Sequence, residues 1–259
     1  MAFAELKDVR IHYELTGPPN APALMFSNSL GATLSMWDAQ MPKITKTFRA
    51  LRYDKRGHGQ SSVPTGPYTL EQLGRDAVGL LDFLKLDSVH FCGLSIGGQT
   101  GMWLGIHAPK RMKKLVLCNT GAKIGASEAW NTRIDAVRKG GVKAISGAVI
   151  DRWFTADFRA KQPAEISKIQ QALESVNPEG YAGCCAAVRD FDCREKLSGI
   201  QTPTLVIAGA HDPATPPADG RFVAEKIPGA RYVELEAAHL SNIEDRDRFT
   251  AEVGKFLAG

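Results

Sequence analysis

The chain has 259 residues, 44% of them hydrophobic, and a formal net charge of +4 at pH 7. This is the composition of an ordinary globular protein, long enough for one large domain or two small ones with a sizeable core. The mild charge without a basic run argues against a nucleic-acid partner, and the lack of any apolar stretch approaching 18 residues argues against a membrane span.

The N-terminal segment predicts the edge of a sheet followed by a buried strand. Residues 4–9 and 10–16 alternate as the two strands of an edge hairpin would, and residues 23–26 form a continuous apolar run. The segment contains no basic stretch that leads into an apolar run. We therefore expect no secretory signal and a cytoplasmic location.

Alternating helices and strands are predicted from there to residue 118. Short apolar runs indicate strands, and amphipathic segments with polar caps indicate helices. The expected elements are a helix over 36–45 capped by Ser35, a strand over 49–53, a helix opening at Thr69, a strand over 89–92, a helix over 99–107 and a strand over 114–118. In the glycine-rich loop over 54–66, we expect Arg56 and His58 to brace the loop rather than to catalyse. The alternation predicts a mostly parallel sheet flanked by helices.

A serine between two glycines joins the strand over 89–92 to the helix that follows it, in the stretch Gly93-Leu94-Ser95-Ile96-Gly97. A strand, a sharp turn and a helix in this order are typical of a nucleophile elbow. Side chains at Gly93 or Gly97 would collide with the neighbouring strand and helix, so glycine suits both positions. A G-x-S-x-G pattern arises by chance in roughly one chain in ten of this length. The motif alone therefore does not identify a catalytic serine, and the residues that could act with Ser95 must be found elsewhere in the chain.

The character of the chain changes between residues 121 and 196. Predicted strands disappear, and the segments resemble polar helices separated by glycines and prolines. We interpret residues 121–196 as a helical cap inserted into an α/β core of residues 1–120 and 197–259, because the segment lacks an apolar repeat of its own. Such a cap covers a pocket and excludes water. The cap residues that could line a small pocket and supply a cation are Trp130, Arg133, Arg138, Trp153 and Arg189.

The five cysteines do not indicate a metal site or a disulfide framework. They are odd in number, lack C-x-x-C spacing, and include the adjacent pair Cys184-Cys185. We therefore expect no metal, and the chemistry suggested by the elbow requires no other cofactor.

Two strands after the cap lead into candidate partners for Ser95. A serine hydroxyl needs an adjacent base that is itself oriented by a third group. Residues 204–208 form a buried-type strand before the turn that contains Asp212, and the strand over 231–235 precedes a loop that contains His239. Taken singly, Asp212 could be a turn former before a proline and His239 an ordinary loop residue. The chain order Ser, Asp, His and the strand context favour a catalytic triad.

A hydrolytic serine also needs hydrogen-bond donors for the negative charge that develops on the substrate oxygen. One donor after such an elbow is the N–H of the next residue, here Ile96, and the other comes from the loop after an earlier strand. Residues 28–31 follow the apolar run over 23–26, and by position the donor there is the N–H of Leu30. The alternative is a plain loop between a strand and a helix.

The chain resembles an α/β-hydrolase throughout, and within that superfamily it resembles the 3-oxoadipate enol-lactonases, in stretches that cover most of the chain outside residues about 120 to 200. The elbow and the Arg-Gly-His-Gly turn are specific only to the superfamily, whereas Asn28-Ser29 together with Phe91-Cys92-Gly93 indicates the lactonases. The matching stretches are Phe26-Ser27-Asn28-Ser29-Leu30-Gly31, Ser35-Met36-Trp37-Asp38, Leu51-Arg52-Tyr53-Asp54-Lys55-Arg56-Gly57-His58-Gly59, Phe91-Cys92-Gly93-Leu94-Ser95-Ile96-Gly97-Gly98 and Gly209-Ala210-His211-Asp212.

The resemblance implies an α/β-hydrolase fold with a mostly parallel sheet of eight strands and an inserted helical cap. It also implies a substrate, 3-oxoadipate enol-lactone, which is a small ring ester that carries a carboxylate and is opened to 3-oxoadipate in the β-ketoadipate pathway of aromatic catabolism. A closed pocket must pair that carboxylate, and arginine matches it best. We expect Arg133, one helical turn from Trp130, to do so, with Arg138 or Arg189 as the next candidates.

Several other functions stay open at this point. A general carboxylesterase or a perhydrolase without a cofactor would share the triad and differ only in the cap, and a carbon–carbon bond hydrolase would also keep the serine. A ligand receptor with little turnover is a further alternative. Nothing in the sequence indicates the oligomeric state.

Overall fold

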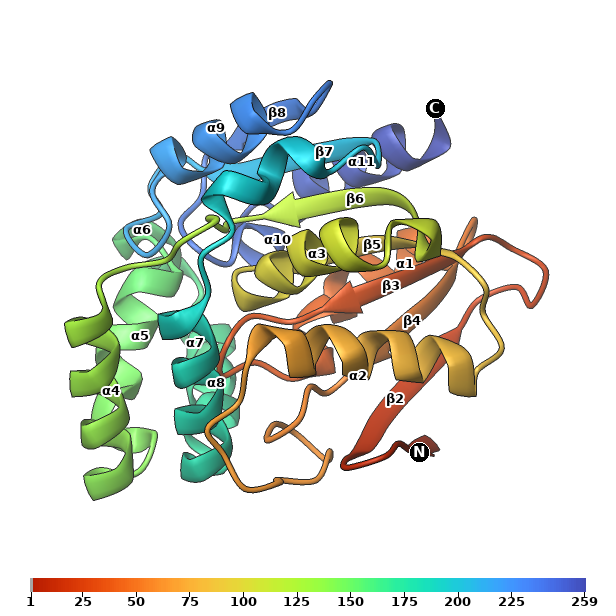
Figure 1. Cartoon of the computed structure of the whole chain (residues 1–259). Helices are drawn as coiled ribbons and strands as arrows, with labels where there is room; N and C mark the ends of the chain where they lie inside the picture. The colour runs from red at the N-terminus through yellow and green to blue at the C-terminus, as the bar shows by residue number, and fades with distance from the viewer. Residues whose placement is uncertain (1) are drawn as a thin grey trace.

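The computed structural model describes residues 2–259, which form an eight-stranded sheet in the order β1-β2-β4-β3-β5-β6-β7-β8 (Figure 1). The strands are β1 (Ala2–Glu5), β2 (Arg10–Thr16), β3 (Ala23–Ser27), β4 (Arg49–Tyr53), β5 (Val89–Leu94), β6 (Met112–Cys118), β7 (Thr204–Gly209) and β8 (Arg231–Leu235). β1 pairs with β2 and β2 with β4 in antiparallel fashion, and the other pairs are parallel. The predicted fold, with a mostly parallel sheet of eight strands, is confirmed.

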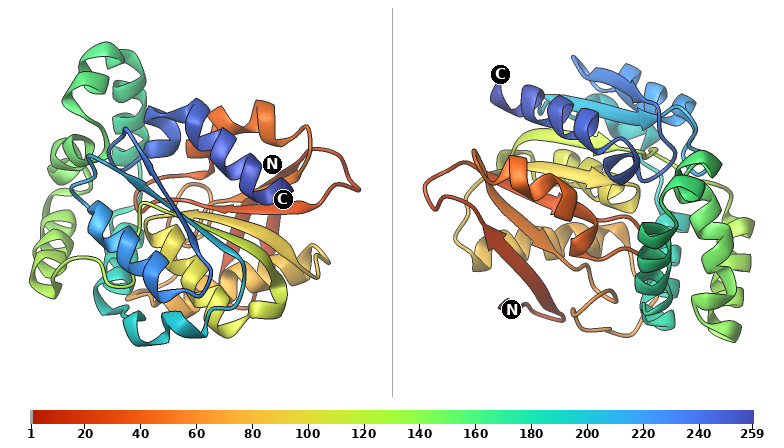
Figure 2. Two further views of the ribbon diagram at one scale, coloured as in Figure 1. Left: turned by 90° about the horizontal axis from the view of Figure 1, so that it is seen from above. Right: turned by 180° about the vertical axis from the view of Figure 1, so that it is seen from behind.

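Helices cover both faces of the sheet, with α2, α3 and α9 on one face and α1 and α11 on the other (Figures 1 and 2). The helices are α1 (Met41–Ile44), α2 (Leu70–Phe83), α3 (Ile96–His107), α4 (Ser127–Gly140), α5 (Lys143–Trp153), α6 (Ala156–Lys161), α7 (Pro163–Glu174), α8 (Pro178–Asp190), α9 (Pro217–Lys226), α10 (Ser241–Glu244) and α11 (Arg246–Ala258), with 3-10 helices η1 (Leu34–Gln40), η2 (Pro109–Arg111) and η3 (Arg194–Gly199). Within residues 2–259, no helix combines the length and the apolar character that crossing a bilayer requires.

Five helices, α4 to α8, lie between β6 and β7 in the chain and gather at one end of the sheet (Figure 1). We call them the cap helices. Their buried side chains, such as Trp153 and Leu173, belong to the same hydrophobic cluster as Trp37 of η1 and Phe249 of α11. The cap helices are thus packed on the sheet domain through shared apolar contacts rather than around a core of their own.

The predicted helix over 36–45 is wrong in type and in its cap. Residues 34–40 form the 3-10 helix η1, and the α-helix α1 is only one turn long. Pro42 near the start of α1 has no N–H to continue a helix that began earlier, so the chain restarts there. The residue before η1 is Thr33, and the Ser35 hydroxyl bonds to its Oγ1 at 2.9 Å instead of capping a helix.

Candidate active site

The turn between β5 and α3 holds Ser95 at backbone angles of φ 61° and ψ −120°. A positive φ is strained for a residue with a side chain and persists only where the surroundings enforce it. Here they do, because a Cβ atom on Gly93 would lie 2.2 Å from the Gly97 carbonyl oxygen, and one on Gly97 would lie 2.1 Å from that of Ser27. Only glycine therefore allows β3, β5 and α3 to approach so closely around Ser95.

Asp212 and His239 meet beside this turn, each in a loop that follows a strand. Asp212 comes after β7 and His239 after β8, and because these strands are parallel neighbours their following loops emerge at the same edge of the sheet. The His239 Nδ1 atom lies 2.8 Å from the Asp212 Oδ2 atom, and both residues are buried. The pairing leaves Nε2 of the imidazole for a reaction partner.

The Asp212 carboxylate is surrounded by donors. Its Oδ1 accepts hydrogen bonds from the N–H groups of Ala214 and Thr215, and its Oδ2 accepts from the Thr215 hydroxyl at 2.7 Å and from Asn119 Nδ2 at 3.0 Å. Burial by itself raises the pKa of this carboxyl, but the charge of His239 and these hydrogen bonds outweigh it and lower the pKa of Asp212. Asp212 therefore stays ionised and able to orient His239 at neutral pH.

Asn119 was not predicted from the sequence. It follows β6 directly, with φ 43°, and its amide also donates to the Ala238 carbonyl at 3.1 Å, while its Oδ1 accepts from the Ser241 hydroxyl at 2.6 Å. It thus connects the end of β6 with the loops of Asp212 and His239. A polar residue at the carboxyl end of a buried strand was the signal that could have revealed it.

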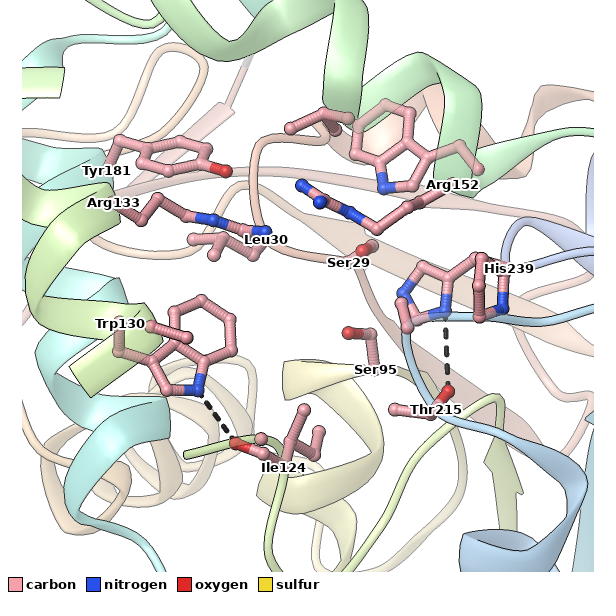
Figure 3. A pocket seen from close by; sticks show the side chains of 16 residues that line it. Ser29, Leu30, Ser95, Ile124, Trp130, Arg133, Arg152, Tyr181, Thr215 and His239 are labelled. Atoms are coloured by element: carbon pink, nitrogen blue, oxygen red, sulfur yellow. Dashed lines mark hydrogen bonds between the residues drawn. The ribbon is translucent and has the colours of Figure 1, made fainter. Parts of the chain in front are cut away.

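Ser95 and His239 line one pocket of about 200 Å³ between the sheet and the cap helices (Figure 3). The Ser95 hydroxyl points into the cavity, and the residue as a whole is 9% exposed. Within residues 2–259 no hydrogen bond joins Ser95 to His239, which is common in structures without substrate because catalytic hydrogen bonds often tighten only in the complex.

Two backbone N–H groups near Ser95 have no acceptor within the described part of the chain, namely that of Leu30, which lines the pocket, and that of Ile96, the residue after Ser95. Ile96 opens α3, where the first N–H groups lack a partner inside the helix. The loop that carries Leu30 is braced on both sides, because Asn28 Oδ1 accepts from Trp37 Nε1 at 2.8 Å and His58 Nε2 accepts from the Gly31 N–H at 3.0 Å. The expected bracing role of His58 has this contact as its basis.

The cap helices contribute two guanidinium groups to the pocket, those of Arg133 on α4 and Arg152 on α5. They point toward each other across the cavity, and Arg133 lies over the Trp130 ring at 4.8 Å from its centroid (Figure 3). Burial and then the positive charge of Arg133 lower the pKa of Arg152. Neither guanidinium forms an ion pair with a carboxylate of residues 2–259. Arg152 was not predicted, because an arginine beside Asp151 has no feature that separates it from a surface residue.

The other predicted cap residues divide between the pocket and the surface. Trp130 and Trp153 line the pocket together with Arg133. Arg138 lies outside it and pairs with Glu179 at 3.4 Å, while Arg189 also lies outside and pairs with the adjacent Asp190 at 2.8 Å. The expectation that Arg138 or Arg189 could line the pocket is thus corrected, because neither reaches the cavity, whereas Arg133 does.

A family model described as alpha/beta hydrolase fold matches residues 22–246. The 3-oxoadipate enol-lactonase 2 of Acinetobacter baylyi is 44% identical over 247 residues, which cover 95% of this chain and 92% of that protein. The chain belongs to the α/β-hydrolases, in the family of the 3-oxoadipate enol-lactonases.

Solved structures of this fold family agree with that assignment. The crystal structure of the enol-lactonase from Burkholderia xenovorans LB400 is 46% identical, covers both chains fully and superimposes with a TM-score of 0.99. A thermophilic esterase from Thermogutta terrifontis, solved with malate bound, is 29% identical over 96% of this chain and 93% of that chain, with a TM-score of 0.91. The enol-lactonase fold is therefore matched over the whole chain, and an esterase shares most of it.

The close contact at the elbow can be tested by adding one methyl group. Gly97→Ala should lower the free energy of unfolding by about 3 kcal/mol and abolish hydrolysis, because the new Cβ meets backbone that cannot move aside. Gly147→Ala is the control, since that residue lies inside α5 with no atom within 4 Å of the added Cβ, and it should leave stability equal or up to about 1 kcal/mol higher. Urea unfolding and ester hydrolysis measure both variants; equal stability of the two would contradict the contact.

Proposed function

We propose that the chain hydrolyses 3-oxoadipate enol-lactone to 3-oxoadipate in the catabolism of aromatic compounds. The pocket carries the proposal, because Ser95 shares a cavity of about 200 Å³ with two guanidinium groups that form no ion pair with a carboxylate of residues 2–259. A cavity of this size suits a small substrate, and the two cations suit a substrate with a carboxylate. The enol-lactonase that is 44% identical over most of both chains supports the same substrate.

The proposed reaction begins with attack of the Ser95 Oγ on the ring carbonyl. His239 takes the hydroxyl proton, and Asp212 holds the imidazole in the tautomer that can accept it. The N–H groups of Leu30 and Ile96 then bind the negative oxygen of the tetrahedral intermediate. Collapse breaks the ring C–O bond, His239 gives its proton to the departing enolate oxygen, and the product is an acyl-enzyme whose enol end remains attached to the same molecule.

Water completes the reaction. His239 activates a water molecule that attacks the acyl-enzyme, and 3-oxoadipate leaves after Ser95 regains its proton. The enolate is a better leaving group than an alkoxide and tautomerises to a ketone, so ring opening is effectively irreversible. These steps require only groups that the chain itself supplies.

The cap helices, within the segment 121–196, are proposed to close the pocket and to recognise the substrate. Trp130 and Trp153 would shield the ring from water, and Arg133 would bind the remote carboxylate in two parallel hydrogen bonds, with Arg152 contributing the second cation. We also propose a cytoplasmic location, because all five cysteines are free and buried, as is usual for proteins of a reducing compartment.

A general carboxylesterase is the second candidate, favoured by the similarity to the Thermogutta esterase. Such an enzyme would use the same triad and oxyanion donors. It would gain nothing from the two guanidinium groups, because a neutral ester offers them no partner. Selectivity for a carboxylated substrate therefore separates the two candidates.

The triad predicts that the losses of kcat caused by two mutations are not additive. Ser95→Ala and His239→Ala should each lower kcat by about 10⁴-fold or more and leave the fold intact, because both residues act in the same proton transfer. The double variant should be little worse than either single one. Losses that multiply in the double variant would show that the two residues act independently and would reject the triad.

The role of Arg133 is tested with two substrates. Arg133→Ala should lower kcat/KM on the lactone at least about thirtyfold, because removing one member of a buried charge pair costs about 2–5 kcal/mol. Hydrolysis of neutral 4-nitrophenyl acetate should fall far less, since the triad is untouched. Arg138→Ala, from the same helix but paired with Glu179 outside the pocket, is the matched control and should leave both rates unchanged. Equal losses on both substrates for Arg133→Ala would contradict carboxylate binding.

A further inference from the structure

The two ends of the peptide group between Ser29 and Leu30 differ in their hydrogen bonding. Among residues 2–259 its N–H, on Leu30, has no acceptor, and Leu30 lines the pocket, while its carbonyl oxygen, on Ser29, accepts a hydrogen bond from Lys55 Nζ at 2.8 Å. The same oxygen also accepts from the Ala32 N–H at 3.2 Å. Lys55 is only 3% exposed, so a buried ammonium group lies behind a proposed oxyanion donor.

Among residues 2–259, no carboxylate forms an ion pair with the Lys55 ammonium group. The neighbouring carboxylate of Asp54 binds other groups, namely His12 Nδ1 at 2.8 Å and the N–H groups of Leu34 and Gln60. Among residues 2–259, the acceptor of the Lys55 ammonium is the Ser29 carbonyl. A buried lysine that donates to a backbone carbonyl instead of a carboxylate is costly for folding, and this cost points to a role in function.

We propose that Lys55 is a positioning residue that fixes and polarises the Ser29–Leu30 peptide, which strengthens the Leu30 N–H as an oxyanion donor. The inference deepens the proposed function and rests on the proposed role of Leu30. A cation at the carbonyl end of a peptide draws electron density away from its N–H end. Hydrogen bonds in such a chain strengthen one another, by about 10–30% per bond in the condensed phase, and a buried site screens the charge weakly.

The charge on Lys55 depends on pH within a measurable range. Burial lowers the pKa of Lys55 to about 8, so the ammonium form is present below pH 8 and is lost as the pH rises through that value. The titratable groups that face it are Asp54 and His58 on its own loop and Cys184 on α8. Burial raises the pKa of the Cys184 thiol to about 12 and lowers that of His58 well below its usual value, so neither changes charge near pH 8.

The experiment compares wild type with Lys55→Met on 4-nitrophenyl acetate, a neutral ester whose own charge does not vary with pH. We expect kcat/KM at pH 7 to fall about tenfold in the variant, less than the 10²- to 10³-fold that follows removal of a whole oxyanion donor. The inhibition constant of adipate, a dicarboxylate that develops no oxyanion, should stay unchanged. Lys43→Met, which alters an exposed lysine paired with Asp247, is the control for loss of a positive charge.

The pH profile provides a measurement that needs no variant. In wild type, kcat/KM should fall above about pH 8 as Lys55 loses its proton. Lys55→Met should lack the alkaline fall. A wild-type profile that stays flat from pH 8 to 10, or a folded Lys55→Met with unchanged kcat/KM, would overturn the role of Lys55.

The substrate assignment, the triad and the role of Lys55 would each be rejected by a different result. If the protein hydrolyses the neutral ester with the alkaline fall but ignores the lactone, the substrate assignment fails and the role of Lys55 stands. If Ser95→Ala keeps its activity on the neutral ester, the triad fails whatever Lys55 does. If the lactone is hydrolysed but Lys55→Met matches wild type in rate and profile, only the role of Lys55 is rejected.

Discussion

Backbone packed against backbone around Ser95 is the constraint on which the rest of the site depends. With no Cβ at Gly97, the start of α3 can lie against the carbonyl of Ser27 at the end of β3. That approach brings the loop after β3 and the first N–H groups of α3 to the same side of the sheet. The N–H groups of Leu30 and Ile96, which have no acceptor among residues 2–259, therefore lie on two segments that the same close contact brings together around the strained Ser95.

The charged groups at and behind the pocket fall into three cases, and the differences correspond to function. The Asp212 carboxylate is fully supplied with donors by the protein, which suits a group that must stay ionised and fixed. Among residues 2–259 no carboxylate pairs with the guanidinium groups of Arg133 and Arg152, which repel each other, so a bound carboxylate would relieve both. Lys55 lies between these cases, because its ammonium group donates to a peptide whose N–H belongs to Leu30, a residue that lines the pocket.

The fold, the family and the elbow were predictable because they depend on local order in the sequence. The pattern strand, glycine, serine, glycine, helix requires nothing distant, and Asp212 and His239 each follow a strand at the edge where α/β sheets bind ligands. The candidate site residues that line the cap side of the pocket were only partly predictable. Trp130 and Arg133 lie one turn apart on α4, so a shared face could be foreseen from helical spacing.

What could not be predicted depends on contacts between distant segments. The pairing of Arg138 with Glu179 bridges 41 positions, and the pairing of Asn119 with Asp212 bridges 93, so neither leaves a local signal. Arg152 reaches the pocket only because α5 packs with the other cap helices at the end of the sheet. The break between η1 and α1 was foreseeable from Pro42, since proline interrupts the hydrogen bonding of a helix that has already begun.

The central claim is that a serine hydrolase site has been adapted to a carboxylated enol-lactone. The most direct measurement is kcat/KM of the purified protein on 3-oxoadipate enol-lactone and on the methyl ester of the same lactone, which keeps the ring and removes the charge. We expect the free acid to be preferred at least about thirtyfold, because only it can pair with the two cap arginines. Equal rates on the two compounds, or a preference for the methyl ester, would contradict the claim and favour a general esterase.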